Sequence, residues 1–136
     1  PKPPDPTLAP TPQRGTRPMK TYETIKLESP QEHVVLVTLN RPDVVNAMNT
    51  QMGLDLLATF DGFCAAPNKQ RCIVITGSGP KAFCAGGDLT RMEKAAALTP
   101  AESKTEASRF ARLLHRVHAF PKPVIARGQR NLAFKL

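Results

Sequence analysis

The sequence predicts an α/β fold, because two strongly apolar segments flank a segment with helical periodicity. The run His33–Leu39 is almost continuously apolar and rich in β-branched residues, which is typical of a strand covered on both faces. Cys72–Thr76 has the same character. Between them, Thr50 to about Ala65 places large apolar residues at helical spacing. A strand, a helix and a strand in this order predict two parallel strands joined by a right-handed crossover.

The part of the chain before this unit divides into a tail and a strand. Residues 1–18 hold seven of the 14 prolines and few large apolar side chains. We therefore predict a disordered, Pro-rich, basic tail over residues 1–20, with order beginning near Tyr22. Tyr22–Leu27 alternates like a half-buried strand, and a turn at Ser29–Glu32 would join it to His33–Leu39 as a hairpin.

After Cys72–Thr76 the pattern becomes helical again. A short helix is predicted over Leu89–Leu98, and Thr99, Pro100 and Glu102 form the signature of a capping box at the start of another. This second helix should end before Pro121, and Pro123–Ala126 should be a final buried strand. The apolar face expected on the helix consists of Ala107, Phe110, Ala111, Leu114 and Val117.

The composition favours a cytoplasmic protein with reduced thiols. The three cysteines have no C-x-x-C spacing, and no apolar run approaches the ~20 residues of a membrane span. The net charge of +8 is concentrated at the ends, because residues 1–20 and 127–136 carry +3 each and the middle only +2. No aromatic residues are interleaved with the terminal charges, so we expect no nucleic-acid partner. Because no apolar run is long enough to span a bilayer, we expect no membrane partner either.

The most informative segment is Ala82–Leu89, which we call the glycine turn. It follows a predicted strand and opens a predicted helix, where backbone N–H groups lack intrahelical partners and attract an anion or a developing oxyanion. Gly86 and Gly87 allow a ligand to approach the backbone, and Asp88 is a good N-cap. The turn is therefore a candidate anion-stabilising site.

Other candidate groups are weaker. Gly77–Ala82 fits the G-x-G-x-x-A pattern of a dinucleotide site, but no helix is predicted to start there, so we interpret it as a turn. His115 and His118 have no third ligand indicated nearby, and no metal site is expected. Glu93 is better interpreted as an exposed helix carboxylate than as a site residue.

Two motifs together resemble the N-terminal signatures of the enoyl-CoA hydratase/isomerase (crotonase) superfamily. They are Leu39-Asn40-Arg41-Pro42 followed by Asn46-Ala47-Met48-Asn49, and Phe83-Cys84-Ala85-Gly86-Gly87-Asp88-Leu89. The resemblance covers about residues 21–126. It implies a crotonase-like (ClpP/crotonase) spiral of β-β-α units, incomplete at the C-terminus, in a family that forms homotrimers or hexamers.

The resemblance also assigns roles. It implies an acyl-CoA substrate, no separate cofactor because coenzyme A is part of that substrate, and hydration of 2-enoyl-CoA thioesters in fatty-acid or branched amino-acid breakdown. The thioester oxygen would bind the backbone N–H of Gly87, a catalytic oxyanion donor. The residues that would line the adenine and pantetheine entrance are Asp43, Val44 and Val45. Those that would contact the thioester end are Ala85, Gly86, Gly87, Asp88 and Leu89.

The sequence departs from the family after Ala126. Phe134-Lys135-Leu136 stands where the family has a glycine triplet, and the catalytic glutamates beyond it have no counterpart. We therefore expect a truncated member with a non-family basic tail over residues 127–136, inactive by itself and doubtful in its assembly. Two alternatives stay open: a catalytically inactive CoA-binding or interaction module, and a basic-tailed adaptor or nucleic-acid binder with salt-dependent affinity.

Overall fold

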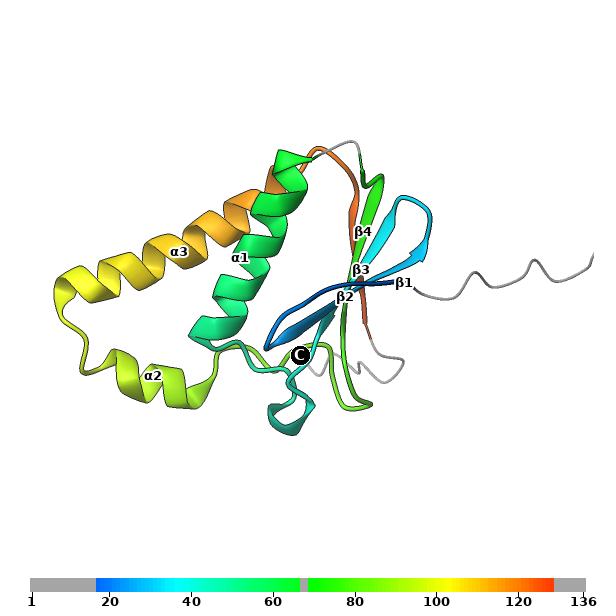
Figure 1. Cartoon of the computed structure of the whole chain (residues 1–136). Helices are drawn as coiled ribbons and strands as arrows, with labels where there is room; N and C mark the ends of the chain where they lie inside the picture. The colour runs from blue at the N-terminus through cyan, green and yellow to red at the C-terminus, as the bar shows by residue number, and fades with distance from the viewer. Residues whose placement is uncertain (1–16, 67–68, 129–136) are drawn as a thin grey trace, which may run out of the picture.

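The computed structural model describes residues 17–66 and 69–128, which form one sheet with helices on one of its faces (Figure 1). The strands of the described residues, in the order in which they lie in the sheet, are β1 (Arg17–Thr21), β2 (Ile25–Gln31), β3 (Val34–Leu39), β4 (Cys72–Gly77) and β5 (Val124–Arg127). The helices are α1 (Thr50–Ala65), α2 (Leu89–Ala95) and α3 (Pro100–His118), with a 3₁₀ turn η2 (Pro42–Val44).

The strand pairing confirms the α/β fold. Strands β2 and β3 form the expected antiparallel hairpin, and β3 pairs with β4 in parallel across helix α1. The hairpin turn lies at Glu32 and His33 rather than at Ser29–Glu32, because β2 continues to Gln31. The register between β2 and β3 is irregular between Glu28 and Gln31, and this irregularity accommodates Pro30, which has no N–H for a regular ladder.

The N-terminal boundary was predicted too late in the sequence. Strand β1 begins at Arg17 and pairs with β2 in antiparallel fashion, so residues 17–20 belong to the sheet and not to a tail. An edge strand held by main-chain hydrogen bonds needs few apolar side chains, and composition therefore did not reveal it. The rest of the predicted tail, residues 1–16, lies outside the described residues, as does most of the predicted basic tail at 129–136.

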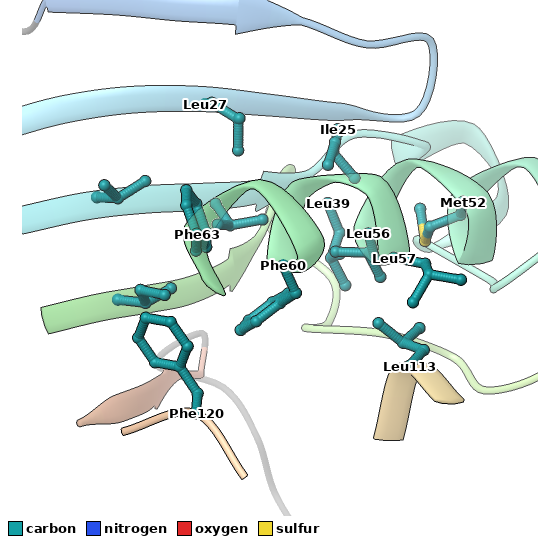
Figure 2. Close-up of a cluster of buried hydrophobic side chains, with 13 residues drawn as sticks. Ile25, Leu27, Leu39, Met52, Leu56, Leu57, Phe60, Phe63, Leu113 and Phe120 are labelled. Atoms are coloured by element: carbon teal, nitrogen blue, oxygen red, sulfur yellow. The ribbon is translucent and has the colours of Figure 1, made fainter. Parts of the chain in front are cut away.

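The hydrophobic core lies between one face of the sheet and α1 (Figure 2). The strands contribute Ile25, Leu27, Val35, Val37, Leu39 and Ile73, and α1 contributes Met52, Leu56, Leu57, Phe60 and Phe63. Phe120 closes the core after α3, with its ring perpendicular to that of Phe60 at a centroid distance of 6.0 Å. The buried Asp55 of α1 also accepts hydrogen bonds from the backbone N–H and the hydroxyl of Thr24, which fixes the helix to the start of β2.

The buried face of α3 differs from the predicted one. Leu113 is 3% exposed, whereas Leu114 is 55% exposed and Phe110 is 38% exposed. Ala107 and Ala111 are exposed as well, and of the predicted face only Val117 packs against the core. Arg112 and Arg116 pair with Asp61 of α1, which places the Leu113 side of α3 against α1.

Strands β3, β4 and β5 are less covered than predicted, and in β4 only Ile73 and Thr76 are buried. Residues of β3 alternate between buried and half-buried, and β5 is half-buried to exposed, with Ile125 at 51% exposure. The physical reason is that the helices of the described residues lie on one face of the sheet (Figure 1). Strand β5 also runs one residue beyond the expected family boundary, to Arg127.

Candidate active site

The glycine turn connects β4 to α2, as the sequence predicts. Asp88 adopts an extended backbone conformation and caps α2, because its Oδ1 accepts the Thr90 N–H at 2.9 Å. Ala85, Gly86 and Gly87 are exposed, whereas Asp88 is buried. The turn therefore presents its small residues to solvent and keeps its carboxylate inside.

A short parallel ladder joins the turn to the first motif. The Ala85 N–H donates to the Val45 carbonyl at 2.9 Å, the Met48 N–H donates to the Gly86 carbonyl at 2.8 Å, and the Asp88 N–H donates to the Met48 carbonyl at 3.0 Å. Met48 and Gly87 are thus bridge partners. In such a ladder the N–H and carbonyl groups of alternate residues point away from the partner segment, so the backbone of Gly87 faces away from Met48.

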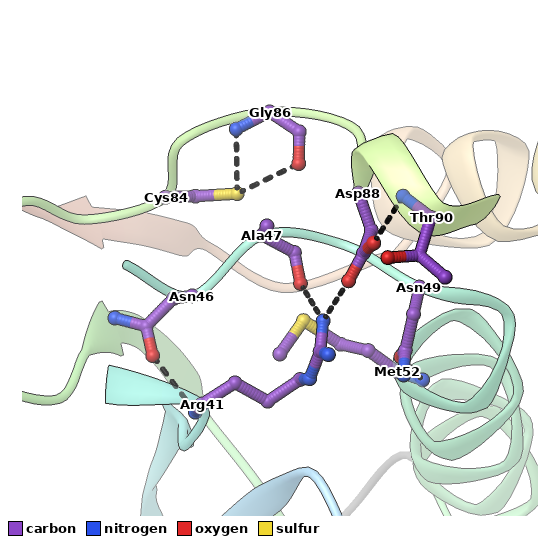
Figure 3. Close-up of polar contacts among 9 residues, drawn as sticks. All are labelled: Arg41, Asn46, Ala47, Asn49, Met52, Cys84, Gly86, Asp88 and Thr90. Atoms are coloured by element: carbon purple, nitrogen blue, oxygen red, sulfur yellow. Dashed lines mark hydrogen bonds and ion pairs between the residues drawn. The ribbon is translucent and has the colours of Figure 1, made fainter. Parts of the chain in front are cut away.

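Of the N–H groups of Ala85, Gly86, Gly87 and Asp88, only that of Gly87 has no acceptor in the described part of the chain. Ala85 and Asp88 donate within the ladder, and the Gly86 N–H lies 3.4 Å from the Cys84 sulfur (Figure 3). Within the described part of the chain, no residue accepts the Gly87 N–H. Gly86 has φ +101°, a conformation that other residues rarely adopt, so glycine is required there to give the turn its shape.

The space beside Gly87 is bordered by a flexible side chain. A Cβ added to Gly87 would lie 2.8 Å from the terminal methyl carbon of Met92 in α2. Met92 is 57% exposed and Leu89, one turn earlier, is 75% exposed. The donor therefore lies next to an apolar surface of α2.

Arg41 holds the two ladder segments together. One guanidinium nitrogen, Nη1, donates to the Ala47 carbonyl and to Asp88 Oδ2, the latter at 2.8 Å (Figure 3). We call Arg41, Ala47 and Asp88 the Arg41 clamp. The side-chain hydrogen bond from Arg41 lowers the pKa of the Asp88 carboxyl below its ordinary value, with a further contribution from the Thr90 N–H.

Asn46 is the buried centre of the loops around the site. Its side chain is 0% exposed, and Oδ1 accepts the Arg41 N–H at 2.9 Å while Nδ2 donates to the Ser78 carbonyl at 2.9 Å. Its backbone is left-handed, with φ +55°, which asparagine tolerates better than most residues. Asn46 therefore connects the first motif to the loop that follows β4.

Of the three residues predicted to line the coenzyme A entrance, one is hydrogen-bonded to the glycine turn in the structure. Val45 meets Ala85 directly through the ladder, whereas Asp43 and Val44 lie on the exposed turn η2. Val45 has φ +55°, which for a β-branched residue costs on the order of 1–3 kcal/mol and is typical of functional sites. Leu89 begins α2 beside the donor.

The motifs contain Arg41, Asn46 and Cys84, but their residue types alone predicted no role for them. The signal available was their position, because all three lie within the two motifs that form the ladder. Segment Gly77–Ala82 contains no helix start, since the next helix in the described chain begins at Leu89, and this agrees with its interpretation as a turn. Glu93 is exposed, as expected.

A cavity of about 830 Å³ lies on the other side of α2, between α2, α3 and the start of α1. Arg41 and Asp88 border it, together with Thr90, Arg91 and Lys94 of α2, whereas Gly87 and Met92 do not line it. The cavity is therefore separate from the donor. Over residues 17–66 and 69–128, no His, Cys, Asp or Glu cluster of metal-binding size occurs, and no helix is long and apolar enough to span a bilayer.

Most of the described chain is similar to known proteins. The family model described as enoyl-CoA hydratase/isomerase matches residues 34–129. The chain is 40% identical over 94 residues to a Thermus thermophilus protein provisionally named an enoyl-CoA hydratase, covering 69% of this chain and 36% of that protein. It is 33% identical over 113 residues to the rat mitochondrial Δ(3,5)-Δ(2,4)-dienoyl-CoA isomerase, covering 77% and 34% of the two chains.

Solved structures show the same relationship. An enoyl-CoA hydratase/carnithine racemase from Magnetospirillum magneticum superposes with a TM-score of 0.71 at 30% identity, covering 80% of this chain and 40% of that one. The chain thus spans somewhat more than a third of the length of these relatives. With the motif ladder, the family match and the shared fold taken together, the chain belongs to the enoyl-CoA hydratase/isomerase family of the crotonase superfamily.

Proposed function

We propose that the glycine turn binds and polarises the thioester oxygen of a 2-enoyl-CoA, the interaction that would stabilise the enolate in the family's hydration reaction. The observation that carries this proposal is the unpaired Gly87 N–H on an exposed turn. An oxyanion donor must have no internal acceptor and must be accessible to the ligand. Within the described chain the Gly87 N–H has no acceptor and faces away from Met48, which supports this role.

The ladder explains how the donor would act without reorganising. Its three backbone hydrogen bonds fix the segments on both sides of Gly87 before any ligand arrives. A preorganised donor of this kind is typically worth about 3 kcal/mol of transition-state stabilisation. Val45 and the exposed turn η2 would contact the coenzyme A part of the substrate, and Leu89 would border its acyl end.

The residues of the glycine turn do not include a side chain that can transfer a proton to the substrate. Asp88 is the carboxylate next to the donor, but Oδ1 is bound to the Thr90 N–H and Oδ2 to Arg41. With its pKa lowered, this carboxyl stays ionised and cannot deliver a proton to the substrate. We therefore expect the 136 residues by themselves to polarise a bound thioester without turning it over.

The test is the carbonyl stretching frequency of crotonyl-CoA labelled with ¹³C at the thioester carbon. Binding to the wild-type chain should lower this frequency, because a hydrogen bond weakens the C=O bond. Gly87→Pro should abolish the shift, since proline removes the free N–H without removing a ladder hydrogen bond. Gly87→Ala is the matched control and should keep the shift, because only the flexible end of Met92 must move.

The same experiment separates the alternatives. Binding with an unchanged carbonyl frequency would favour a CoA-binding or interaction module, and a retained shift in Gly87→Pro would place the donor elsewhere. Turnover by purified chain, free of host hydratase, would contradict the expected inactivity. A cytoplasmic location and assembly into trimers or hexamers are further parts of the proposal, which fractionation of cells and sedimentation would test.

A further inference from the structure

The Arg41 clamp connects the donor turn to the first motif through a single side chain. Arg41 Nη1 bonds to the Ala47 carbonyl and to Asp88 Oδ2, which flank the bridge between Met48 and Gly87 (Figure 3). The arginine and aspartate side chains are only 22% and 11% exposed. An ion pair shielded to this degree is less weakened by solvent than a surface pair.

Arg41 is itself held in place by the buried Asn46. Besides the bond from the Arg41 N–H to Asn46 Oδ1, the Asn46 N–H donates to the Arg41 carbonyl at 2.8 Å. Both main-chain polar groups of Arg41 are thus fixed to a residue with no solvent exposure. The buried Asn46 therefore fixes the backbone of Arg41, and with it the position from which the guanidinium contacts Asp88.

The direction of the Gly87 N–H depends on the two residues that Arg41 holds in register. If Asp88 moved relative to Ala47, the hydrogen bonds from the Met48 N–H to the Gly86 carbonyl and from the Asp88 N–H to the Met48 carbonyl would lengthen. The Gly86 carbonyl lies in the same peptide plane as the Gly87 N–H, so loss of its hydrogen bond would let that N–H turn. Gly86 offers little resistance to such a rotation, because glycine has wide backbone freedom. The turn therefore needs a restraint from outside its own residues.

We infer that Arg41 is a positioning residue that aims the Gly87 N–H at the bound oxygen by holding Ala47 and Asp88 together. This inference rests on the proposed function of Gly87. Arg41 does not touch the substrate in this scheme and moves no proton. Its role requires two acceptors to be held by one nitrogen, which a lysine ammonium on a flexible stem reproduces only in part.

The experiment compares Arg41→Met, Arg41→Lys and the control Arg109→Met, which removes an arginine from an exposed pair with Glu106 on α3. In complexes of the full chain with ¹³C-labelled crotonyl-CoA, Arg41→Met should lose most of the carbonyl shift while the dissociation constant changes by roughly threefold or less. Arg41→Lys should restore part of the shift, and Arg109→Met should match the wild type.

Amide hydrogen exchange in the free chain gives a readout that needs no ligand. Arg41→Met should speed exchange of the Met48 and Asp88 amides by roughly tenfold or more relative to any change at Phe60 in α1, because local opening releases the ladder whereas Phe60 reports only the change in global stability. Equal acceleration at Phe60 would mean that Arg41 only supports global stability, and this would overturn the inference. Unchanged exchange at Met48 and Asp88 would overturn it as well.

The two proposals fail in distinguishable ways. A wild-type chain that leaves the carbonyl frequency of crotonyl-CoA unchanged contradicts the proposed function, whatever the exchange data show. A normal wild-type shift that survives in Arg41→Met contradicts the role of Arg41 alone. If no ligand shift is seen, the exchange rates of Met48 and Asp88 still decide whether Arg41 holds the turn.

Discussion

Gly77 and Asn46 lie so close together that no other residue fits at position 77 without displacement. A Cβ on Gly77 would lie 2.8 Å from Asn46 Nδ2 and still closer to the Phe83 carbonyl oxygen, which belongs to the backbone. Glycine at the end of β4 thus allows the buried asparagine and the segment leading into the glycine turn to meet. This contact is part of what places the turn beside the first motif.

Gly77→Ala should therefore destabilise the chain. The added methyl group must displace backbone as well as a buried side chain, and overpacking of this kind typically costs about 1–3 kcal/mol. Urea unfolding followed by circular dichroism measures the change. A variant within experimental error of the wild type would mean that the Phe83 segment moves freely and that the contact is not restrictive.

Two glycines inside α1 should respond in the opposite direction. Apart from the chain neighbours and the backbone of α1 itself, no atom of the described residues lies within 4 Å of a Cβ added at Gly53 or Gly62. Replacing either with alanine should stabilise the chain by about 0.5–1 kcal/mol, because glycine in a helix loses more backbone entropy on folding. The same unfolding measurement serves as the control for Gly77→Ala. Destabilisation at either site would indicate that α1 packs against something at that position.

Leu113 and Leu114 form a matched pair on α3 with opposite burial. Leu113→Ala should cost about 2–4 kcal/mol, since it removes a side chain that is 3% exposed in the core. Leu114→Ala should change the free energy of unfolding by about 0.5 kcal/mol or less, because its side chain is 55% exposed. Similar losses for both variants would show that α3 is rotated relative to the arrangement described above.

The stability of the chain should fall with acid partly through Asp88. The hydrogen bond from Arg41 lowers the pKa of Asp88 in the folded state below its ordinary 3.8. A lowered pKa means that the contribution is fully present above pH 3.8 and is lost as the pH falls through the folded-state value.

Measuring the free energy of unfolding of the wild type and of Asp88→Asn between pH 6 and pH 3 tests whether Asp88 stabilises the chain above, and not below, its folded-state pKa. The difference between the two free energies of unfolding should shrink as the pH falls below about 4. Arg41→Met should show the same loss of acid dependence, because Arg41 is the main cause of the shift. Glu102 contributes an independent slope in the same direction, since its hydrogen bonds from Thr99 also lower its pKa. A difference that grows below pH 4 would contradict the assignment.

The candidate site shows which features sequence motifs predict and which they do not. Residue types at a strand-to-helix connection predicted the glycine turn, because they indicate where backbone N–H groups are exposed, and the family resemblance singled out Gly87 within it. They did not reveal that the N–H groups of Gly86 and Asp88 are occupied. That depends on Cys84 and on the ladder to Met48, which lies about forty residues earlier, and only the folded arrangement brings these groups together.

The sequence by itself determined the elements whose signals are local. The bounds of α1, the capping box of Thr99 and Glu102, and the parallel pairing of β3 with β4 follow from periodicity, capping chemistry and connection length. The tertiary structure decided which side of α3 is buried, that β1 extends the sheet, and that β5 is exposed. Helix α3 carries more than one stripe of apolar residues, and packing against α1 with the ion pairs to Asp61 selects the Leu113 side. These features depend on contacts between residues far apart in the chain. A local sequence pattern contains no information about the free energy of such contacts.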